Sequence, residues 1–252
     1  MASLVWKLLA LATVTAAQAT NTNLRTTFPT ATSTTNLAAV RTIAAGQSFD
    51  GGNLQWDRGP STCNGQSEGG EKDAVFILQH GATLSNVIIG PNNGEGVHCK
   101  GACTLNNVWW TDVCEDAATF RQTGASDISY VNGGGARNAD DKVFQHNGAG
   151  TVIVSNFFAS NVGKLYRSCG NCGTQYARRS EFRNVKVEKT KVVAGVNGNL
   201  GDRTAVRNSC LLGGAGDCWR YDGNNSGNEP VKVGSGPDGV VCVTEGIRTS
   251  GC

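Results

Sequence analysis

ATLSNVIIG (Ala82–Gly90) and CTLNNVWW (Cys103–Trp110) are two copies of one pattern, in which an apolar residue stands two places before an asparagine. Weaker copies follow: SDISYVNGG from Ser126, VIVSNFFAS from Val152, SEFRNVKVE from Ser180 and TAVRNSCLL from Thr204. Aligning the copies on the apolar residue superposes Leu84, Leu105, Ile128, Val154, Phe182 and Val206, at intervals of 21 to 28 residues. A short strand that recurs at about this period is typical of a solenoid protein.

The composition favours a β-solenoid over a leucine-rich repeat. The chain has 34 glycines, many asparagines and no long stretch with helical periodicity. Each rung of such a coil buries side chains against the rungs above and below. Because neighbouring residues of a strand face opposite sides, Trp109 and Trp110 should point in opposite directions, and so should Phe157 and Phe158. A β-sandwich is the alternative architecture for this pattern.

The 252 residues fit one domain preceded by a signal. Residues 1–19 predict a secretory signal peptide, since a short apolar run is followed by Ala17-Gln18-Ala19, which has the small-x-small pattern of a cleavage site. Residues 20–39 are threonine-rich and predict a disordered leader, a removed pro-segment or an O-glycosylated stalk. The solenoid is expected over residues 40–212. No other stretch is long and apolar enough to cross a bilayer, so no membrane partner is expected.

Ten cysteines follow the signal, and in a secreted chain they predict disulfides. Cys169-x-x-Cys172 is also compatible with a redox or zinc motif. The pairs Cys169–Cys172 and Cys242–Cys252 are near in sequence and are the first to consider. Residues 213–252 carry three cysteines and a poor repeat, which predicts a tail tied back by disulfides over one end of the coil.

The net charge of +2 gives no support for binding nucleic acid, but the charges are unevenly distributed. Between Gly65 and Asp116 seven acidic residues stand against two basic ones, and between Ala117 and Ser180 seven basic residues stand against three acidic ones. The acidic block could hold a cation and the basic block an anion. An uneven but merely solvated surface is the alternative interpretation.

The spacing of the acidic residues indicates where a cation could bind. Glu95 precedes Glu115 by 20 residues and Asp116 by 21, so one rung could bring all three carboxylates together. Such a group would be costly without a cation, and Ca²⁺ accepts about 6–8 oxygen ligands in irregular geometry. Lys142 and Arg167 are 25 residues apart, which predicts stacked cations suited to a polyanion. Side chains on a solvated turn would give the same spacings without any site.

Long motifs make the chain resemble the class III pectate lyases (polysaccharide lyase family 3), which fungi, oomycetes and some bacteria secrete. The resemblance covers roughly Ala44 to Leu211. It is carried by FDGG from Phe49, GQSEGGEKDAVFIL from Gly65, GATLSNVIIG from Gly81, EGVHCKGACTLNNVWWTDVCEDAATF from Glu95, GGGARNADDKVFQHNGAGTV from Gly133 and GKLYRSCGNC from Gly163.

The resemblance implies a right-handed parallel β-helix that is a secreted, monomeric enzyme. It implies Ca²⁺-dependent β-elimination of polygalacturonate, the de-esterified pectin of plant cell walls, with 4,5-unsaturated oligogalacturonides as products. Residue by residue, it implies calcium ligands at Glu95, Glu115 and Asp116, catalytic residues at Lys142, Arg167 and Glu71, and substrate-binding bases at Arg121 and Lys164. Glu95 stands where many relatives have Asp, and Arg121 replaces a frequent Lys.

The chemistry accounts for these residue types. The proton at C5 of a galacturonate is a weak acid, and a cation on the adjacent carboxylate would spread the charge that forms. The base must be neutral to accept the proton, so an alkaline optimum is expected. We expect Lys142 to be the base and Arg167 to hold the carboxylate, with the exchange of these roles left open. The alternative functions are a polygalacturonase-like hydrolase using Asp140-Asp141, and a non-catalytic secreted homologue.

Overall fold

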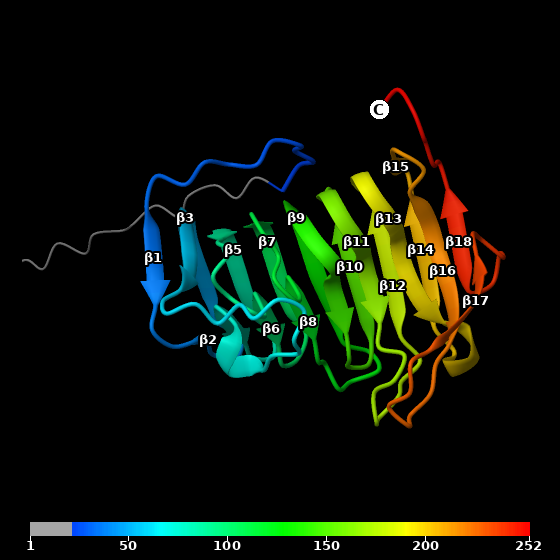
Figure 1. Ribbon diagram of the computed structural model, residues 1–252, viewed down its shortest axis with the longest axis horizontal. Coiled ribbons are helices and arrows are strands. Elements are labelled where there is room, and N and C mark those ends of the chain that lie inside the picture. Colours follow the sequence, from blue (N-terminus) through cyan, green and yellow to red (C-terminus); the bar gives the residue numbers. More distant parts are fainter. Residues whose placement is uncertain (1–21) are drawn as a thin grey trace, which may run out of the picture.

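The computed structural model describes residues 22–252, which form a parallel β-helix elongated along one axis (Figure 1). Every named strand pairing in this part of the chain is parallel except the one between the sixteenth and seventeenth strands. The predicted parallel β-helix is therefore confirmed, and the β-sandwich alternative is wrong. The predicted signal peptide, residues 1–19, lies outside the described residues.

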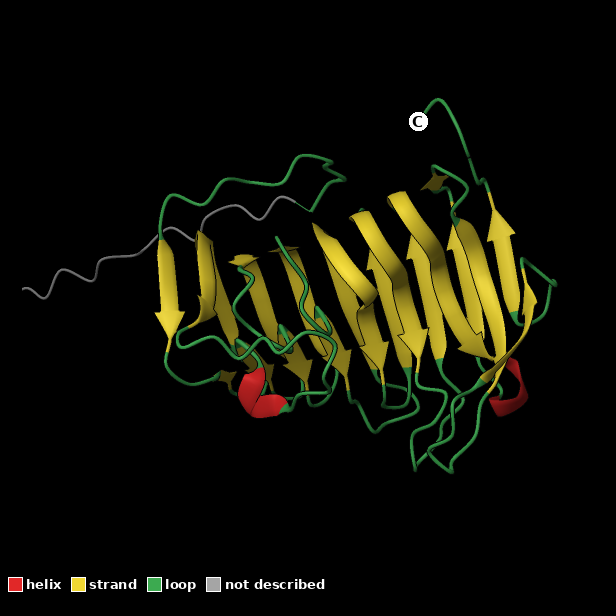
Figure 2. Ribbon diagram, viewed as in Figure 1, coloured by secondary structure: helices red, strands yellow, loops and turns green. Residues whose placement is uncertain are grey.

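The described chain is almost entirely strands and turns, with two short 3₁₀ helices (Figure 2). The strands are β1 (Thr34–Leu37), β2 (Arg41–Ile43), β3 (Ser48–Arg58), β4 (Phe76–Leu78), β5 (Ala82–Ile89), β6 (Val97–Cys99), β7 (Cys103–Trp110), β8 (Ala118–Phe120), β9 (Ile128–His146), β10 (Thr151–Ser155), β11 (Phe158–Ser168), β12 (Arg179–Arg183), β13 (Lys186–Asn197), β14 (Arg203–Arg207), β15 (Cys210–Leu211), β16 (Gly216–Asp222), β17 (Val231–Ser235) and β18 (Cys242–Glu245). The 3₁₀ helices are η1 (Glu71–Asp73) and η2 (Gly198–Leu200).

The stacking register confirms five of the six aligned residues and corrects the third. Val131, not Ile128, pairs with Leu105 on one side and Val154 on the other. The sequence alignment matched Tyr130 with the repeated asparagine, but Gly133 takes that position. Ile128 instead points outward and is 39% exposed. The stack that results runs through Phe49, Leu84, Leu105, Val131, Val154, Phe182 and Val206.

The repeated asparagine is the residue at which the backbone of each rung changes direction. Its backbone is left-handed, a conformation that asparagine tolerates better than most residues. The side chains also bond between rungs: Asn107 Nδ2 donates to Asn86 Oδ1 at 2.9 Å, and Asn184 Nδ2 donates to Asn156 Oδ1 at 2.7 Å. The residues concerned, with φ between 49° and 58°, are Asn86, Asn107, Asn156, Asn184 and Asn208. The motif therefore encodes the turn as well as the strand.

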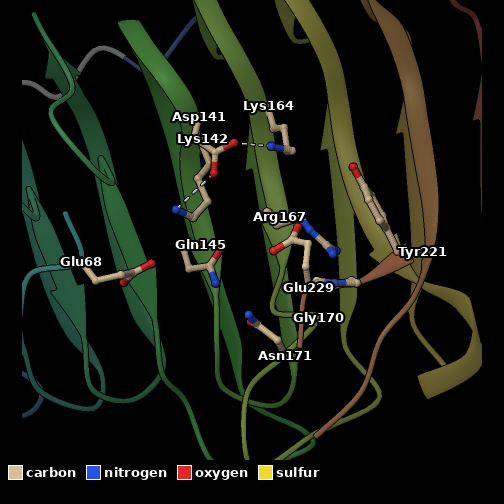
Figure 3. Close-up of a pocket in the computed structure, with 11 residues that line it drawn as sticks. Glu68, Asp141, Lys142, Gln145, Lys164, Arg167, Gly170, Asn171, Tyr221 and Glu229 are labelled. Carbon is tan, nitrogen blue, oxygen red and sulfur yellow. Dashed lines mark hydrogen bonds and ion pairs between the residues drawn. The ribbon is translucent and has the colours of Figure 1, made fainter. Parts of the chain in front are cut away.

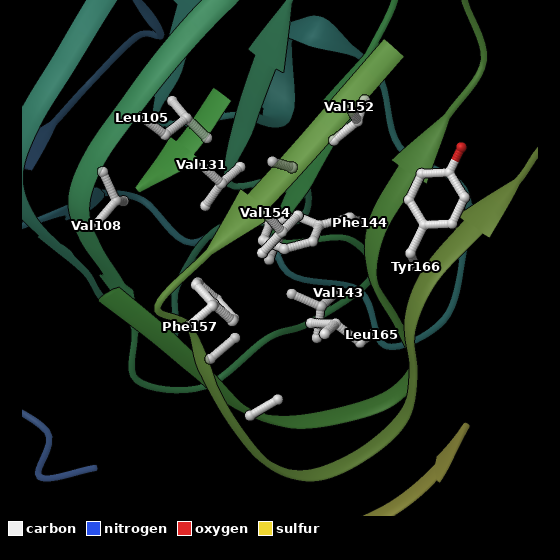
Figure 4. Packing of buried hydrophobic residues seen from close by; sticks show 14 of the residues in the cluster. Leu105, Val108, Val131, Val143, Phe144, Val152, Val154, Phe157, Leu165 and Tyr166 are labelled. Atoms are coloured by element: carbon white, nitrogen blue, oxygen red, sulfur yellow. The ribbon is translucent and has the colours of Figure 1, made fainter. Parts of the chain in front are cut away.

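Aromatic and branched side chains fill the interior of the coil (Figure 4). Trp110 packs against Phe144 with ring centroids 6.0 Å apart, and Phe144 packs against Phe157 at 5.1 Å. Burial of such rings is the main favourable term for folding, at about 25 cal/mol per Å² of apolar surface. Trp110 and Phe157 belong to this core and Trp109 and Phe158 do not, so the predicted opposite directions are confirmed.

The segment before β1 covers the outward-pointing rings, which are buried as a result. The ring of Phe28 lies 5.0 Å from that of Trp109 and 6.0 Å from that of Phe158, and the Arg25 guanidinium lies 5.6 Å from the Trp109 ring. β1 then pairs in parallel with β3. The described part of this segment, residues 22–39, is thus ordered against the coil, unlike a disordered leader, which was one of the three expectations for residues 20–39. Threonine-rich composition concealed the few aromatic and basic side chains that attach this segment to the coil.

All ten cysteines form disulfides: Cys63–Cys114, Cys99–Cys103, Cys169–Cys172, Cys210–Cys252 and Cys218–Cys242. The expected Cys169–Cys172 pair is confirmed, and the expected Cys242–Cys252 pair is wrong. The coil also continues past residue 212, because β16 pairs with β13 and β18 pairs with β14, both in parallel. The tail therefore extends the stack before its disulfides close it.

Within residues 22–252, none of the helices has the length and apolar character needed to cross a membrane.

Candidate active site

A groove of about 240 Å³ runs over the outer face of β9 and β11 (Figure 3). Charged side chains from β9, from β11 and from two loops meet there. The lining residues are Glu68, Asp141, Lys142, Gln145, Lys164, Arg167, Gly170, Asn171, Tyr221, Glu229 and Pro230.

The groove brings together the predicted cations Lys142, Lys164 and Arg167. Their strand register differs from the one expected. Lys164 lies opposite Lys142 in the β9–β11 ladder, and Arg167 lies opposite Gln145. Lys142 and Arg167 are therefore one rung and three residues apart, and the direct stacking inferred from their 25-residue spacing is wrong. Lys142 and Arg167 are 8% and 9% exposed, so both cations are largely removed from water.

Lys142 is held by carboxylates on three sides. Its Nζ lies 2.6 Å from Glu115 Oε1, 3.3 Å from Asp116 Oδ1 and 3.4 Å from Asp141 Oδ2. Asp141 also pairs with Lys164, and so links the two neighbouring lysines. The ammonium therefore forms one ion network with the predicted calcium ligands.

This network shifts the pKa values of its members. Burial disfavours the charged lysine, but the carboxylates of Asp116, Glu115 and Asp141 outweigh burial and raise the pKa of Lys142 above its usual value. Burial also raises the pKa of Glu115 and of Asp116, although Lys142 opposes both shifts. The nearest charges to Lys142 in this arrangement are thus anions, which favour its protonated form.

Glu68, Glu95 and Glu115 converge beside this network. Each offers a carboxylate oxygen, and these three atoms all lie within 4.8 Å of one another. Asp116 is adjacent, and its carboxylate is close enough to Glu95 for the two charges to repel. Among residues 22–252, Glu115 Oε2 is buried without a hydrogen-bond partner, and the buried Asp116 Oδ1 has only its ion pair with Lys142. Converging carboxylates with unbonded oxygens fit a hard, oxygen-preferring cation such as Ca²⁺.

Glu68 was not among the ligands predicted from the sequence. It belongs to the acidic block, yet it lies on an irregular loop for which no repeat gives a register. The Cys63–Cys114 disulfide fixes that loop to the residue before Glu115, and Gln66 Nε2 donates to Cys114 O at 2.5 Å. The disulfide pairing was the signal that could have located Glu68.

Two contacts orient the carboxylate of Glu95. His98 Nε2 lies 2.8 Å from Oε2, and the Gly69 amide donates to Oε1 at 3.0 Å. His98 is fully buried, and its Nδ1 has no hydrogen-bond partner among residues 22–252. A carboxylate can only accept when ionised, so Nε2 carries the proton of this contact. His98 is thus a structural partner of a predicted metal ligand.

Glu71 and Arg121 do not line the groove with Lys142. Instead they bind each other, with Arg121 Nη1 3.3 Å from Glu71 Oε1, and the same oxygen pairs with Lys100. The hydrogen bond from Lys100 lowers the pKa of Glu71, so this carboxylate stays ionised. The structure therefore places these two predicted site residues in a separate ion cluster.

Arg167 has a different environment from Lys142. Its guanidinium lies 4.0 Å from the centre of the Tyr221 ring, and Nη1 donates to Ser168 O at 2.7 Å and to Asn197 Oδ1 at 3.0 Å. Among residues 22–252 no carboxylate forms an ion pair with this guanidinium, and burial lowers the pKa of Arg167. A guanidinium fixed by neutral groups keeps its charge for an incoming anion.

Comparison with known proteins identifies the family of the chain. Residues 25–228 match the family model described as pectate lyase. The chain is 49% identical over 214 residues to a probable pectate lyase E of Aspergillus clavatus, covering 84% of this chain and 83% of that protein. It is 47% identical over 211 residues to pectate lyase E of Emericella nidulans, covering 83% of this chain and 81% of the relative.

Solved structures are similar across most of the fold. The catalytic domain of pectate lyase PelI from Erwinia chrysanthemi aligns with a TM-score of 0.67 at 28% identity, covering 85% of this chain and 98% of that one. PelI in complex with tetragalacturonic acid aligns with a TM-score of 0.68 at 30% identity, covering 81% and 68%. Because residues 25–228 match the family model and the fold aligns with solved pectate lyases, the chain belongs to the pectate lyase family.

Proposed function

We propose that this chain is a secreted class III pectate lyase that cleaves polygalacturonate by Ca²⁺-dependent β-elimination, leaving 4,5-unsaturated oligogalacturonides. The observation that supports this most directly is the shared network of Lys142 with Glu115 and Asp116 beside Glu68 and Glu95. One groove then offers a cation site and a potential base. The five disulfides fit an extracellular protein, and we expect it to act as a monomer.

Polygalacturonate is the substrate that this groove suits. The polymer carries a carboxylate on each sugar, and Lys142, Lys164 and Arg167 line the groove on two neighbouring rungs. The related PelI was solved with tetragalacturonic acid, a short form of such a chain. We infer that Lys164 and Arg167 receive carboxylates of the substrate, where the planar guanidinium of Arg167 can form two parallel hydrogen bonds.

Glu95, Glu115 and Asp116, together with Glu68, would hold the calcium ion. When bound, Ca²⁺ supplies an electrophile for the substrate carboxylate next to C5, which makes the C5 proton easier to remove. His98 and the Gly69 amide keep Glu95 turned toward the site. Glu71 holds Arg121 in the proposed scheme, so that Arg121 can contact a more distant sugar.

Lys142 is the proposed base and Arg167 the group that stabilises the developing negative charge. Lys142 is protonated while Glu115 and Asp116 keep their full charge beside it. A divalent ion held by these carboxylates would take up part of their charge and so would lower the pKa of Lys142, whose neutral amine is the group that accepts the C5 proton. The electron pair of the C5–H bond then forms the C4–C5 double bond as the C4–O bond breaks, and the leaving oxygen takes a proton from water.

The hydrolase alternative has little support from the geometry. Asp140 and Asp141 are neighbours on β9, but Asp141 lines the groove and Asp140 lines other depressions of the surface. Burial opposes the charge on Asp141, but Lys164 and Lys142 outweigh it and lower the pKa of Asp141. A general acid needs a raised pKa, which Asp141 lacks.

The test is to incubate the protein with polygalacturonate and follow the ultraviolet absorbance of unsaturated uronides. We expect product in Ca²⁺, none after EDTA, and recovery when Ca²⁺ is restored. Full activity in calcium-free buffer would reject the metal role. New reducing ends without absorbance would indicate hydrolysis, and binding without either signal would indicate a non-catalytic homologue.

A further inference from the structure

A second cationic surface lies on the outer face of β12 and β14, away from the groove just described. Arg179 pairs in register with Arg203, and Arg183 pairs with Arg207. Ser180 and Thr204 between them are buried, so the arginines point outward. Parallel rungs lie about 4.8 Å apart, and two guanidinium rows therefore cross this face of the coil. We call this surface the arginine face.

The two rows differ in how their charge is compensated. Arg183 and Arg207 both pair with Glu181, and Arg207 also pairs with Glu245. The guanidinium of Arg179 donates to Gly201 O at 2.9 Å, and that of Arg203 to Asp202 O at 2.7 Å. Neither has a carboxylate partner among residues 22–252. Like charges in register repel, so this uncompensated row favours an external anion.

The arginine face is hollow rather than flat. A depression of about 310 Å³ has three arginines and one carboxylate in its lining, and that carboxylate, Glu181, is already paired with Arg183 and Arg207. The lining residues are Thr151, Arg179, Ser180, Glu181, Arg203, Thr204, Ala205, Arg207, Val240 and Val243. Ala205 lies between Glu181 and Val243 in the ladder, and its short side chain leaves the space. The combination of guanidinium groups with an apolar floor suits a sugar acid, whose ring presents C–H groups beside its carboxylate.

The rungs next to the depression extend this apolar floor. Thr151 of β10 lies opposite Arg179, and Ile153 lies opposite Glu181. Tyr130 follows Ile153 on the next rung and is 39% exposed, as is Ile128 beside it. An exposed aromatic ring in line with the depression gives a sugar chain a further surface to pack on.

The active-site groove and the arginine face are separate surfaces. The groove lies over β11 and the later part of β9, around Lys142, whereas the face lies over β10, β12, β14 and β18, which continue the ladder of the first part of β9. No residue lines both. Occupation of one therefore need not displace a chain from the other.

We propose that the arginine face is an anchoring site for polyuronate, at which Arg179 and Arg203 bind carboxylates of a substrate strand outside the active-site groove. The inference rests on the proposed function, because it takes its ligand from the same polymer. Guanidinium and carboxylate match in geometry, and two adjacent rungs present the cations about one sugar apart. Binding here would hold the enzyme on an insoluble or very long chain.

The first measurement is the Kd for polygalacturonate in EDTA at low salt, which does not require turnover or metal. Arg179→Ala/Arg203→Ala is compared with wild type and with Lys191→Ala/Lys232→Ala, which removes the same charge from exposed positions on β13 and β17. We expect about tenfold weaker binding only for the arginine variant, the loss that two screened charge contacts would give. Fully methyl-esterified pectin should not distinguish the three proteins.

The second measurement compares rates in Ca²⁺ on tetragalacturonate and on long polygalacturonate. The arginine variant should keep the wild-type kcat/KM on the tetramer and show a raised KM on the polymer. Equal binding by wild type and the arginine variant, or an equal loss in both double variants, would overturn the proposal. Absence of unsaturated product from every protein would instead contradict the proposed function, and the binding result in EDTA would still decide the fate of the anchoring site.

Discussion

Lys142 Nζ lies 2.6 Å from Glu115 Oε1, so the proposed base and a proposed calcium ligand are in direct contact. The same ammonium lies 3.3 Å from Asp116 Oδ1. Two buried carboxylates facing one buried ammonium leave an excess of negative charge, which raises the pKa of Lys142 and favours a further cation. Metal binding and deprotonation of the base should therefore be coupled, and this coupling can be measured.

Raising the Ca²⁺ concentration should move the ascending limb of the pH–activity profile to lower pH. The base must be neutral, so kcat/KM rises with pH as Lys142 loses its proton. Glu115 and Asp116 oppose that loss, and a divalent ion that shares their charge weakens the opposition. A shift of one pH unit would correspond to about 1.4 kcal/mol. Rates on tetragalacturonate at low and high Ca²⁺, with NaCl keeping ionic strength constant, are the measurement. An ascending limb that stays at one pH would contradict the coupling.

Lys142→Ala should abolish turnover and also destabilise the calcium-free protein. Loss of a positioned base should slow the reaction by about 10²–10⁴-fold or more. Removing the ammonium leaves Glu115 and Asp116 buried near each other, for which a cost of about 3–5 kcal/mol is typical. Because burial raises the pKa values of both acids, the loss should be largest at high pH, where both are ionised.

Thermal unfolding of Lys142→Ala with EDTA and with Ca²⁺ separates these effects. The Tm should be depressed in EDTA and largely restored by Ca²⁺, which supplies positive charge to the same carboxylates. Lys191→Ala, at an exposed position of β13, is the matched control and should keep both activity and Tm. Normal turnover by Lys142→Ala would show that Lys142 is not the base.

The sequence predicted those parts of the molecule that repeat or that lie on a repeated rung. Glu95 and Glu115 were expected to meet because one turn of the coil separates them, and they do. The predicted register was wrong where the length of the rung changed. Ile128 was placed in the stack that Val131 occupies. Lys142 was stacked on Arg167, although it lies opposite Lys164. Glu68 was missed because a disulfide, not a ladder, positions its loop.

Glu68→Gln should weaken Ca²⁺ binding much more than Glu71→Gln. Glu68 contributes an oxygen to the cluster with Glu95 and Glu115, whereas Glu71 is already paired with Lys100 and Arg121. Losing one charged ligand should raise the Kd about tenfold or more, and Glu71→Gln should leave it within about twofold. Titration calorimetry of the two isosteric variants gives the comparison. The opposite ranking would place the ion at Glu71 and contradict the assigned ligand set.

His98→Leu should weaken Ca²⁺ binding about 10–100-fold, as removal of a group that orients a metal ligand commonly does. Leucine cannot donate to Glu95 Oε2, which would then be a buried acceptor without its partner. His98→Gln retains a donor and should recover most of the affinity. The readouts are the Kd for Ca²⁺ and the Tm in EDTA. Equal Kd values for the leucine and glutamine variants would mean that His98 serves only packing.

His146 should make the fold sensitive to acid, independently of the metal site. It is fully buried, accepts a hydrogen bond from Tyr166 at 2.8 Å through Nδ1, and donates to Ala149 O through Nε2 at 2.9 Å. Burial lowers its pKa to about 3. The unfolded chain, with an ordinary pKa of about 6.5, therefore binds a proton that the folded chain does not. Stability should be fully present above about pH 6.5 and should decline as the pH falls toward 3, by up to about 1.4 kcal/mol per unit.

Denaturant unfolding of wild type and His146→Gln in EDTA, at several pH values from 7 to 4, measures this contribution. Glutamine can both donate and accept a hydrogen bond but does not titrate in this range. At pH 7 the variant should be less stable than wild type, because glutamine fills the space of the imidazole imperfectly. The difference in unfolding free energy should narrow as the pH falls, because only the wild type loses stability through His146. A difference that stays constant with pH would show that His146 protonation does not limit the acid stability of the coil.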